Sequence, residues 1–392
     1  MGVLSSVRLE SWIAIMITLM ACFTRLSMAA GQVFYVIAIL LSIFYIWKHR
    51  HDLYIPSYVK KYSKTFALML LLLLPSAVLT NNIPVGLPEF INVWLWRIPV
   101  FFVIALCIRD KKTLFTMLAV FFVDFGIDNL VAFYQHVSGM TDRGWGFGSS
   151  VLTISGLMVM LVPIFCVILL DSAFPNYVKV SALWALGCVG FGMYGNQSRG
   201  SWLFSMIMVP IVSLPYILKR FIYVVVVLAA LGGVVWGFST QPQYVARFES
   251  ITNTTTDGSN LGRFDVWTSS INMFKDHPVT GVGIGQWRTI YEASYRLPTE
   301  NQHLYHAHNN FIQLLGEVGL LGLLGGLIFY GSIIIDNFVV WFKNRDPYSL
   351  CAMIAVICYV FVFGQIEYTL DNSSGMRIMY FMLATMLQLR DN

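Results

Sequence analysis

The feature that most constrains this chain is a series of apolar runs, each about 16 to 25 residues long. A helix needs about 20 apolar residues to cross the hydrocarbon core of a bilayer. We therefore predict an all-α polytopic membrane protein with about twelve membrane-spanning helices. The approximate spans are residues 10–28, 31–47, 64–79, 92–108, 113–134, 149–170, 178–195, 201–217, 221–238, 311–335, 349–367 and 373–389.

The low content of charged residues excludes a soluble protein. Only 11% of the chain is charged, whereas soluble domains carry about 25% charged residues. The six cysteines fall in apolar stretches at spacings typical of neither a disulfide framework nor a zinc site. We expect them to be small core residues.

The distribution of Lys and Arg predicts the orientation in the membrane, because basic residues accumulate in cytoplasmic loops. The two termini carry Arg8 and Arg390, so both are expected on the cytoplasmic side, in agreement with twelve spans. The remaining basic residues on that side are Lys48, Arg50, Lys60, Lys61, Lys64, Arg109, Lys111, Lys112, Lys179, Lys219, Arg220, Lys343 and Arg345.

The chain is expected to divide into three parts: membrane helices in residues 1–238, a large external loop in residues 239–310, and further membrane helices in residues 311–392. A structureless loop of that length is unusual, so we predict a folded element that lies on the membrane surface as a lid. Pro278 and the Gly281-Val-Gly-Ile-Gly285 segment should end its first helix.

Two helices are predicted within this loop. The second is short, over Gln286 to Tyr295, and the first runs from Asn260 to Lys275. The spacing of the large apolar residues in the first helix gives it one apolar face. That face consists of Leu261, Phe264, Trp267, Ile271 and Phe274.

Basic residues outside the cytoplasmic set are nearly all arginine, which topology alone does not explain. Arg binds phosphate through two parallel hydrogen bonds and stays charged near lipid. The alternative is that individual arginines lie at the interface or pair with acids such as Asp124, Asp128 or Asp371. The candidates for an anion site are Arg199, Arg263 and Arg288, and the others are Arg25, Arg97, Arg143, Arg247, Arg296 and Arg377, with one lysine, Lys275.

His308 precedes the apolar run that starts at Phe311, so it should lie just before a helix N-terminus capped by Asn309 or Asn310. A helix N-terminus favours anions and disfavours imidazolium, so His308 is expected to be neutral and able to accept a proton. A purely structural role is the alternative.

A metal site is a further alternative for this histidine cluster, with His303, His306 and His308 as ligands. The only carboxylates near it in the sequence are Glu292 and Glu300. Glu317 lies nine residues beyond His308, within the predicted span. It is either a functional residue or the partner of a membrane arginine such as Arg97 or Arg377.

At these residues the chain resembles the O-antigen ligase and polymerase superfamily of bacterial envelope enzymes, and most closely the ligases. The ligase pattern is His, then Asn, Ser or Gln, nine residues, Gly, two residues, and Gly, Thr or Tyr. His308, Asn309, Gly319 and Gly322 fit it. The similarity extends from Ser198 to Gly322, and the further matching segments are Ser198-Arg-Gly200 and Arg263, Trp267, His277-Pro278 and Gly281-x-Gly283-x-Gly285.

The resemblance implies a glycosyltransferase-C-like membrane fold in the bacterial inner membrane, with the active site facing the periplasm. The implied reaction moves a glycan from undecaprenyl diphosphate to lipid A–core, without a metal or other cofactor. Membrane lipids are expected partners, and no nucleic acid is expected. His308, Arg199 and Arg263 are the predicted catalytic residues, Arg288, His306 and Asn309 the further substrate-binding residues, and Glu317 a supporting residue.

Three other functions stay open from the sequence. A polymerase would use a second lipid-linked repeat as acceptor, and a protein oligosaccharyltransferase would use protein hydroxyls. A transporter or flippase would place ionisable residues near the bilayer midplane and show repeats in its two halves. The polar residues of this chain concentrate at the outer face, and its halves show no repeat.

Overall fold

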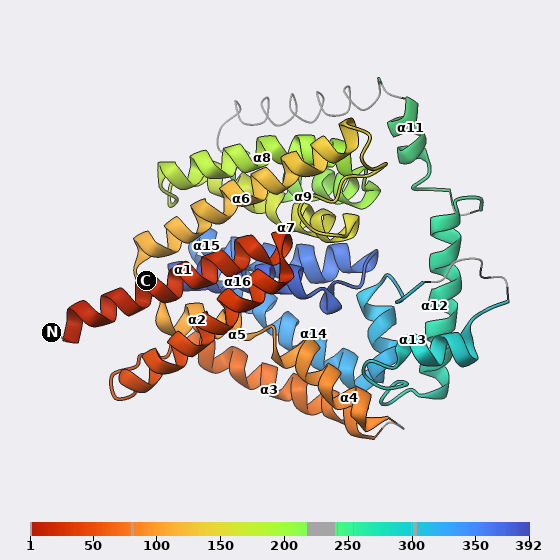
Figure 1. Cartoon of the computed structure of the whole chain (residues 1–392), viewed down its shortest axis with the longest axis horizontal. Coiled ribbons are helices and arrows are strands. Elements are labelled where there is room, and N and C mark those ends of the chain that lie inside the picture. Colours follow the sequence, from red (N-terminus) through yellow and green to blue (C-terminus); the bar gives the residue numbers. More distant parts are fainter. Residues whose placement is uncertain are drawn as a thin grey trace.

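The computed structural model describes residues 2–79, 82–217, 240, 242–253, 255–298, 300 and 304–392, and these residues form helices and loops without strands (Figure 1). The predicted all-α class is therefore confirmed. In the membrane part the helices are α1 (Gly2–Leu26), α2 (Met28–Lys48), α3 (Ser57–Val78), α4 (Ile83–Phe90), α5 (Pro99–Cys107), α6 (Lys111–Val137), α7 (Val151–Leu170), α8 (Asn176–Asn196), α9 (Arg199–Ile217), α14 (Asn310–Asn344), α15 (Pro347–Val356) and α16 (Ser373–Asp391).

Nine helical segments in the described part of the chain are long and apolar enough to cross a membrane. They correspond to nine of the predicted spans, with α4 and α5 forming one segment through the π-turn η1 (Ile91–Leu95). The predicted spans at 201–217 and 373–389 coincide with α9 and α16, which are not among the nine. The predicted span at 221–238 lies outside the described residues.

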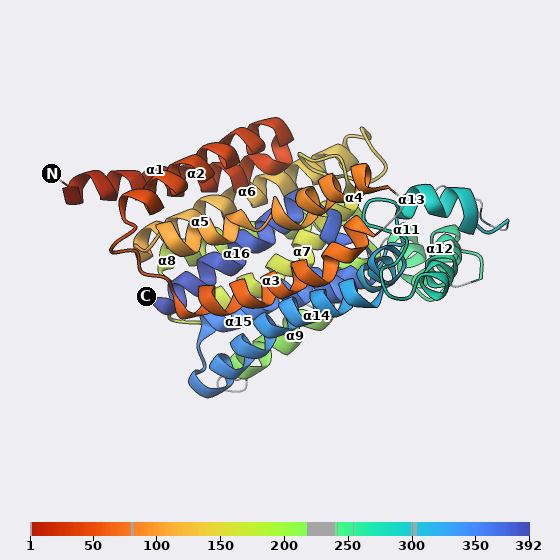
Figure 2. The same ribbon diagram turned by 90° about the horizontal axis from the view of Figure 1, so that it is seen from below.

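The external loop forms α11 (Pro242–Glu249), α12 (Gly258–Asp276), α13 (Trp287–Ile290) and the π-turn η2 (Tyr291–Tyr295). Both views show these helices at one end of the bundle, with the two chain termini toward the opposite end (Figures 1 and 2). This arrangement agrees with the charge pattern, which assigned the termini and the loop to opposite sides of the membrane.

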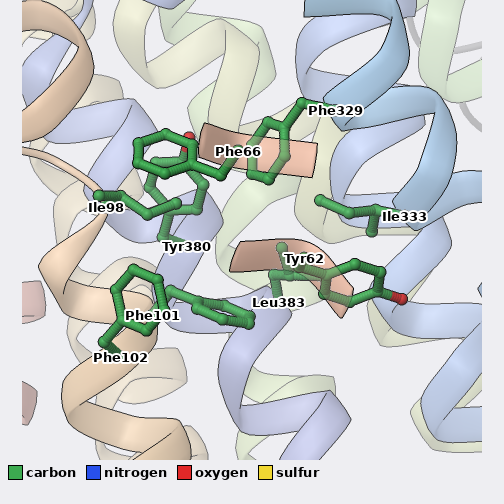
Figure 3. A pocket seen from close by; sticks show the side chains of 9 residues that line it. All are labelled: Tyr62, Phe66, Ile98, Phe101, Phe102, Phe329, Ile333, Tyr380 and Leu383. Carbon is green, nitrogen blue, oxygen red and sulfur yellow. The ribbon is translucent and has the colours of Figure 1, made fainter. Parts of the chain in front are cut away.

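The centre of the bundle is tightly filled, with α7 and α16 almost entirely buried. A void of about 10 Å³ lies between α3, α5, α14 and α16, and its walls are aromatic and aliphatic side chains (Figure 3). The Tyr62 hydroxyl points away from it and accepts a hydrogen bond from Asn337 at 3.1 Å. A void of this size holds about one water molecule, so it provides no path for a solute.

Two membrane arginines are paired with acids, as the alternative interpretation predicted. Arg25 Nε lies 2.5 Å from the Asp128 carboxylate, and Arg97 Nη2 lies 3.0 Å from that of Asp371. These pairs join α1 to α6, and the link between η1 and α5 to the turn before α16. They are structural contacts, because an unpaired charge is costly in a membrane.

The external loop is inserted into a break in α14. Gly319 has φ +64°, and the helix hydrogen bonding is interrupted around it. Val282 N and Gly283 N donate to the carbonyls of Gly316 and Glu317 at 3.0 and 2.9 Å, and Leu320 N donates to Pro278 O at 2.9 Å. The glycine motif of the loop therefore replaces part of the hydrogen bonding of the helix.

The structure confirms the predicted loop helix as α12, which begins after Asp257 and ends before Pro278, but a different face of it packs on the protein. Leu261, Phe264 and Ile271 are about 40% exposed. The buried face has small side chains that allow close approach to α14, and Ser270 and Gly316 meet there. Its residues are Gly262, Val266, Ser269, Ser270 and Met273.

We expect a cysteine at position 275 to react with a membrane-impermeant reagent in intact spheroplasts, and a cysteine at position 60 to react only after lysis. Lys275 and Lys60 are both exposed, at opposite ends of the bundle, and five of the six native cysteines are buried. Labelling of Lys60→Cys but not Lys275→Cys would reverse the predicted orientation.

We expect Gly281→Ala to lower the free energy of unfolding by at least about 1–2 kcal/mol. Gly281 has φ +63°, and an added Cβ would collide with the backbone of Glu317. Gly331→Ala is the matched control, since no atom lies within 4 Å of its Cβ position. Thermal unfolding in detergent measures the difference, and equal midpoints for the two variants would contradict the inserted-loop geometry.

Candidate functional site

The N-terminus of α14 is fixed by its first two asparagines. Asn309 caps the helix, accepting hydrogen bonds from Phe311 N and Ile312 N, as predicted. Asn310 is buried and donates to Val360 O and Thr369 Oγ1, both at 2.8 Å. These contacts hold the residues before the helix against the segment between α15 and α16.

That segment brings Glu367 to the two histidines. Glu367 Oε2 lies 2.9 Å from His308 Nδ1, and Glu367 Oε1 lies 3.2 Å from His306 Nε2. His308 itself has the left-handed φ of +47°, which turns its ring toward the carboxylate. One carboxylate therefore contacts both imidazoles at the outer end of the bundle.

The hydrogen bonds determine the tautomers of the neutral rings. His308 N donates to His306 Nδ1 at 3.2 Å, so Nδ1 of His306 is unprotonated and its Nε2 donates to Glu367. An ionised carboxylate can only accept, so His308 Nδ1 also donates. Nε2 of His308 is therefore the nitrogen with a lone pair, in position to accept a proton.

The pKa values of this cluster agree with a neutral His306 and an ionised Glu367. Burial lowers the pKa of His306 to about 4, against the opposing charge of Glu367. Burial raises the pKa of Glu367, but the hydrogen bond from His308, the two imidazoles and the Arg263 guanidinium together outweigh it, so the net shift is downward. The acid stays ionised at neutral pH.

Arg199 starts α9, two residues after Gln197, which caps the C-terminus of α8 in the left-handed conformation. Its Nη1 donates to Ser250 Oγ at 2.7 Å and lies 3.2 Å from the carboxylate of Asp257. Asp257 is also the N-cap of α12 and accepts from Asn260 N. Arg199 is therefore paired with an acid, as the alternative interpretation of the external arginines allowed, and that acid belongs to the external loop.

Arg263 lies in the second turn of α12 and is partly buried. Within the described part of the chain, its guanidinium forms no hydrogen bond or salt bridge. Burial lowers its pKa, while the charge of Glu367 raises it and that of Arg199 lowers it. Arg263 therefore lies within electrostatic range of Glu367 and of Arg199, with hydrogen-bonding capacity left for a ligand.

Two further arginines belong to the same basic region. Arg143 Nε donates to Asn196 O at 3.0 Å, and Arg247 Nη2 donates to Gln197 O at 3.3 Å. Burial and the charges of Arg247, Arg199 and Arg263 lower the pKa of Arg143 to about 10. The sequence identified both as external arginines but did not assign them to the cluster.

Arg288 has a different environment from the one predicted. Its Nε lies 3.1 Å from Glu292, and its guanidinium stacks over the ring of Tyr305 at 4.0 Å. No contact with Arg199 or Arg263 is found among the described residues. Tyr305 directly precedes His306, so the ring that Arg288 contacts belongs to the histidine side of the site.

Glu317 is not the partner of Arg97 or Arg377, so that alternative is wrong. Its carboxylate accepts from Gly285 N at 2.7 Å and from Gln313 Nε2 at 2.8 Å. Arg97 pairs with Asp371 instead. The predicted pairing is wrong because the external loop inserts beside Glu317 and supplies a backbone N–H to its carboxylate. Glu317 joins the inserted loop to α14.

A candidate metal site in the structure includes the carboxylate of Glu367, which the sequence did not suggest as a ligand. One ligand atom from each of His306, His308 and Glu367 lies within 4.8 Å of the others. Such a set has the donor types that zinc binds. The same atoms are already hydrogen-bonded to one another, so a metal would have to replace both contacts to Glu367. His303 lies outside the described residues.

Comparison with known proteins agrees with the resemblance. A family model described as O-antigen ligase matches residues 182–328, a segment that includes Arg199, Arg263, His308 and Glu317 but not Glu367. No curated protein matches the chain. The match confirms the resemblance to the O-antigen ligase and polymerase superfamily, and supports a glycosyltransferase-like membrane enzyme with lipid-linked glycan substrates.

Proposed function

We propose that this chain transfers a glycan from undecaprenyl diphosphate to a sugar hydroxyl of lipid A–core at the periplasmic face of the inner membrane. The observation that carries the proposal is Arg263, a partly buried guanidinium without a partner among the described residues, near both Arg199 and the His308–Glu367 pair. Such a transfer requires a cation that binds the donor's diphosphate beside a group that accepts the proton of the acceptor hydroxyl.

The basic side of the site suits the donor. Two arginines come from different elements, Arg199 from α9 and Arg263 from α12, and the charge of Arg199 lowers the pKa of Arg263. Arg199 has five N–H donors, and its contacts with Ser250 and Asp257 involve only Nη1 and Nη2. Donors are therefore left for a phosphate. Guanidinium groups bind phosphate oxygens bidentately, and their electrostatic interaction with the phosphate is stronger where water is excluded.

The histidine side suits the acceptor hydroxyl. Nε2 of His308 has a lone pair because Nδ1 donates to Glu367. When His308 takes the hydroxyl proton, the resulting imidazolium is stabilised by the ionised carboxylate. Glu367 thus positions His308 and fixes its tautomer, and it needs no contact with the substrate.

The reaction balances as a single displacement. The acceptor oxygen forms a bond to the anomeric carbon, the bond from that carbon to the diphosphate oxygen breaks, and the hydroxyl proton moves to His308. The leaving diphosphate keeps the bonding electron pair, and Arg199 and Arg263 neutralise the charge that develops. One displacement inverts the configuration at the anomeric carbon.

The external loop supplies the cover over the site. Trp267 Nε1 donates to Ala307 O at 2.7 Å, and Ala307 N donates to Gln313 Oε1 at 2.7 Å. Gln313 then donates to Glu317, which accepts from Gly285 of the loop. This network ties the loop to α14 next to His308, where it can exclude water that would hydrolyse the donor.

A polymerase would use the same residues with another lipid-linked repeat as the acceptor. The family match includes both reactions, so the acceptor is the deciding measurement. Purified protein is supplied with undecaprenyl-diphosphate glycan, with and without lipid A–core. A longer lipid-linked glycan in the absence of lipid A–core indicates a polymerase, and product only in its presence indicates a ligase.

We expect Arg199→Lys and Arg263→Lys to lower the transfer rate by about one to two decades. A hydrogen bond to a charged group contributes about 1.5–3 kcal/mol, and 1.36 kcal/mol corresponds to a tenfold change in rate. Lysine keeps the charge but loses the planar fork. The matched control is Arg296→Lys, a loop arginine near Glu300. Wild-type rates in both folded variants would show that bidentate binding of the diphosphate is wrong.

We expect His308→Ala to abolish transfer and retain donor binding, because its task is at the acceptor. Glu367→Gln should lower the rate at least about tenfold and shift the pH profile, since an amide no longer accepts from both histidines. Donor affinity and transfer are measured on the same preparations. A loss of donor affinity in His308→Ala that equals the loss of transfer would contradict this division of roles.

We expect transfer to survive EDTA, because the proposed charge neutralisation comes from arginines. Activity is measured before and after chelation, and again after adding zinc or magnesium ions. Complete loss on chelation with recovery on adding one ion would instead favour the metal alternative at His306, His308 and Glu367.

A further inference from the structure

A groove runs between the outer halves of α6 and α8. It has a volume of about 500 Å³. Gly187 and Gly190 form its floor on α8, and no atom lies within 4 Å of the position of a Cβ at either residue. The groove is therefore open because these two side chains are missing. Its other lining residues are Phe133, Val137, Phe191 and Tyr194.

The groove opens toward the bilayer. Val137 and Phe191 are 51% and 53% exposed, and both helices are long and apolar enough to span a membrane. The side chains that line it are hydrocarbon except for the tyrosine hydroxyl. The ring of Phe133 on α6 packs against those of Phe191 and Tyr194 on α8, with centroids 5.2 and 5.9 Å apart. These properties suit a hydrocarbon chain.

The outer end of the groove adjoins the basic region. Tyr194 lies two residues before Asn196, whose carbonyl accepts from Arg143, and the next carbonyl accepts from Arg247. The ring of Tyr194 also contacts Tyr244 of α11, the helix that carries Arg247. A chain in the groove would therefore end beside cations.

An apolar groove that ends beside arginine side chains is complementary to a lipid with an anionic head group. From Gly187 to Tyr194 the groove follows seven residues of helix, about 10 Å. That length suits the part of a chain next to its head group, with the remainder in the bilayer. A cluster of four arginines favours a doubly phosphorylated head over the single phosphodiester of an ordinary phospholipid.

We infer that this groove holds the first isoprene units of a polyprenyl diphosphate, with its head group at Arg143 and Arg247. The inference rests on the proposed function for the identity of the donor. It places the donor's entry on the lipid-facing side of α6 and α8, and it gives Arg143 and Arg247 a ligand. Arg199 and Arg263 would then contact the phosphates at the reacting end.

Photo-crosslinking in lipid nanodiscs tests the inference on the whole chain. The probe is a polyprenyl diphosphate with a diazirine in its second isoprene unit. We expect labelled peptides from residues 133–137 and 187–194, competition by unlabelled polyprenyl diphosphate, and little labelling by the matching polyprenol. Equal competition by phosphatidylglycerol, or labelling spread over other helices, would show that the groove is ordinary lipid-facing surface.

The matched variants are Gly190→Leu, which fills the groove, and Gly331→Leu on α14, where no atom lies within 4 Å of the Cβ position. We expect Gly190→Leu to lower labelling about tenfold and Gly331→Leu to label as the wild type. If Gly190→Leu fails to fold, Gly190→Val provides the smaller obstruction. Unchanged labelling in a folded groove variant would overturn the inference.

Transfer assays separate this inference from the proposed function. Gly190→Leu should raise KM for a long-chain donor at least about fivefold and leave KM unchanged for a donor with one isoprene unit, which ends before Gly190, about 6 Å of helix from Tyr194. Equal effects on both donors would count against the groove. Absence of transfer with any acceptor, together with groove labelling, would reject the proposed reaction and keep the lipid site.

Discussion

The insertion of residues 278–285 into the break of α14 is the constraint on which the outer site depends. Hydrogen bonds that a continuous helix would form are made instead to the loop, at the carbonyls of Gly316 and Glu317. The same helix begins with the residues that hold His308. One element therefore positions both the histidine and the loop that carries Arg263 on α12.

The site separates its charges along the chain. The cations come from the loop after α6 and from α9, α11 and α12, whereas the carboxylate that orients the histidines comes from the segment after α15. Arg143 and Arg247 are bound by backbone carbonyls at the end of α8, where the helix dipole favours cations. This arrangement keeps several guanidinium groups close together without neutralising them all.

Local sequence signals predicted the elements but not the contacts between distant segments. The apolar runs gave the spans, and the spacing around His308 gave the helix start and the Asn309 cap. Glu367 was missed because it stands at the edge of an apolar run, 59 positions after His308. The buried face of α12 was missed because small residues, rather than large apolar ones, permit its close packing against Gly316.

Asp257 makes two contacts, and an anion that binds Arg199 would disturb one of them. It caps α12 and it pairs with Arg199. A phosphate that binds Arg199 competes with this carboxylate for the same N–H groups, and a weakened pair loosens the start of the loop helix. If the proposed site binds a phosphate there, its occupancy and the order of the loop are thermodynamically linked, and the linkage is reciprocal. A chain that holds its loop more tightly would bind its anionic substrate more weakly.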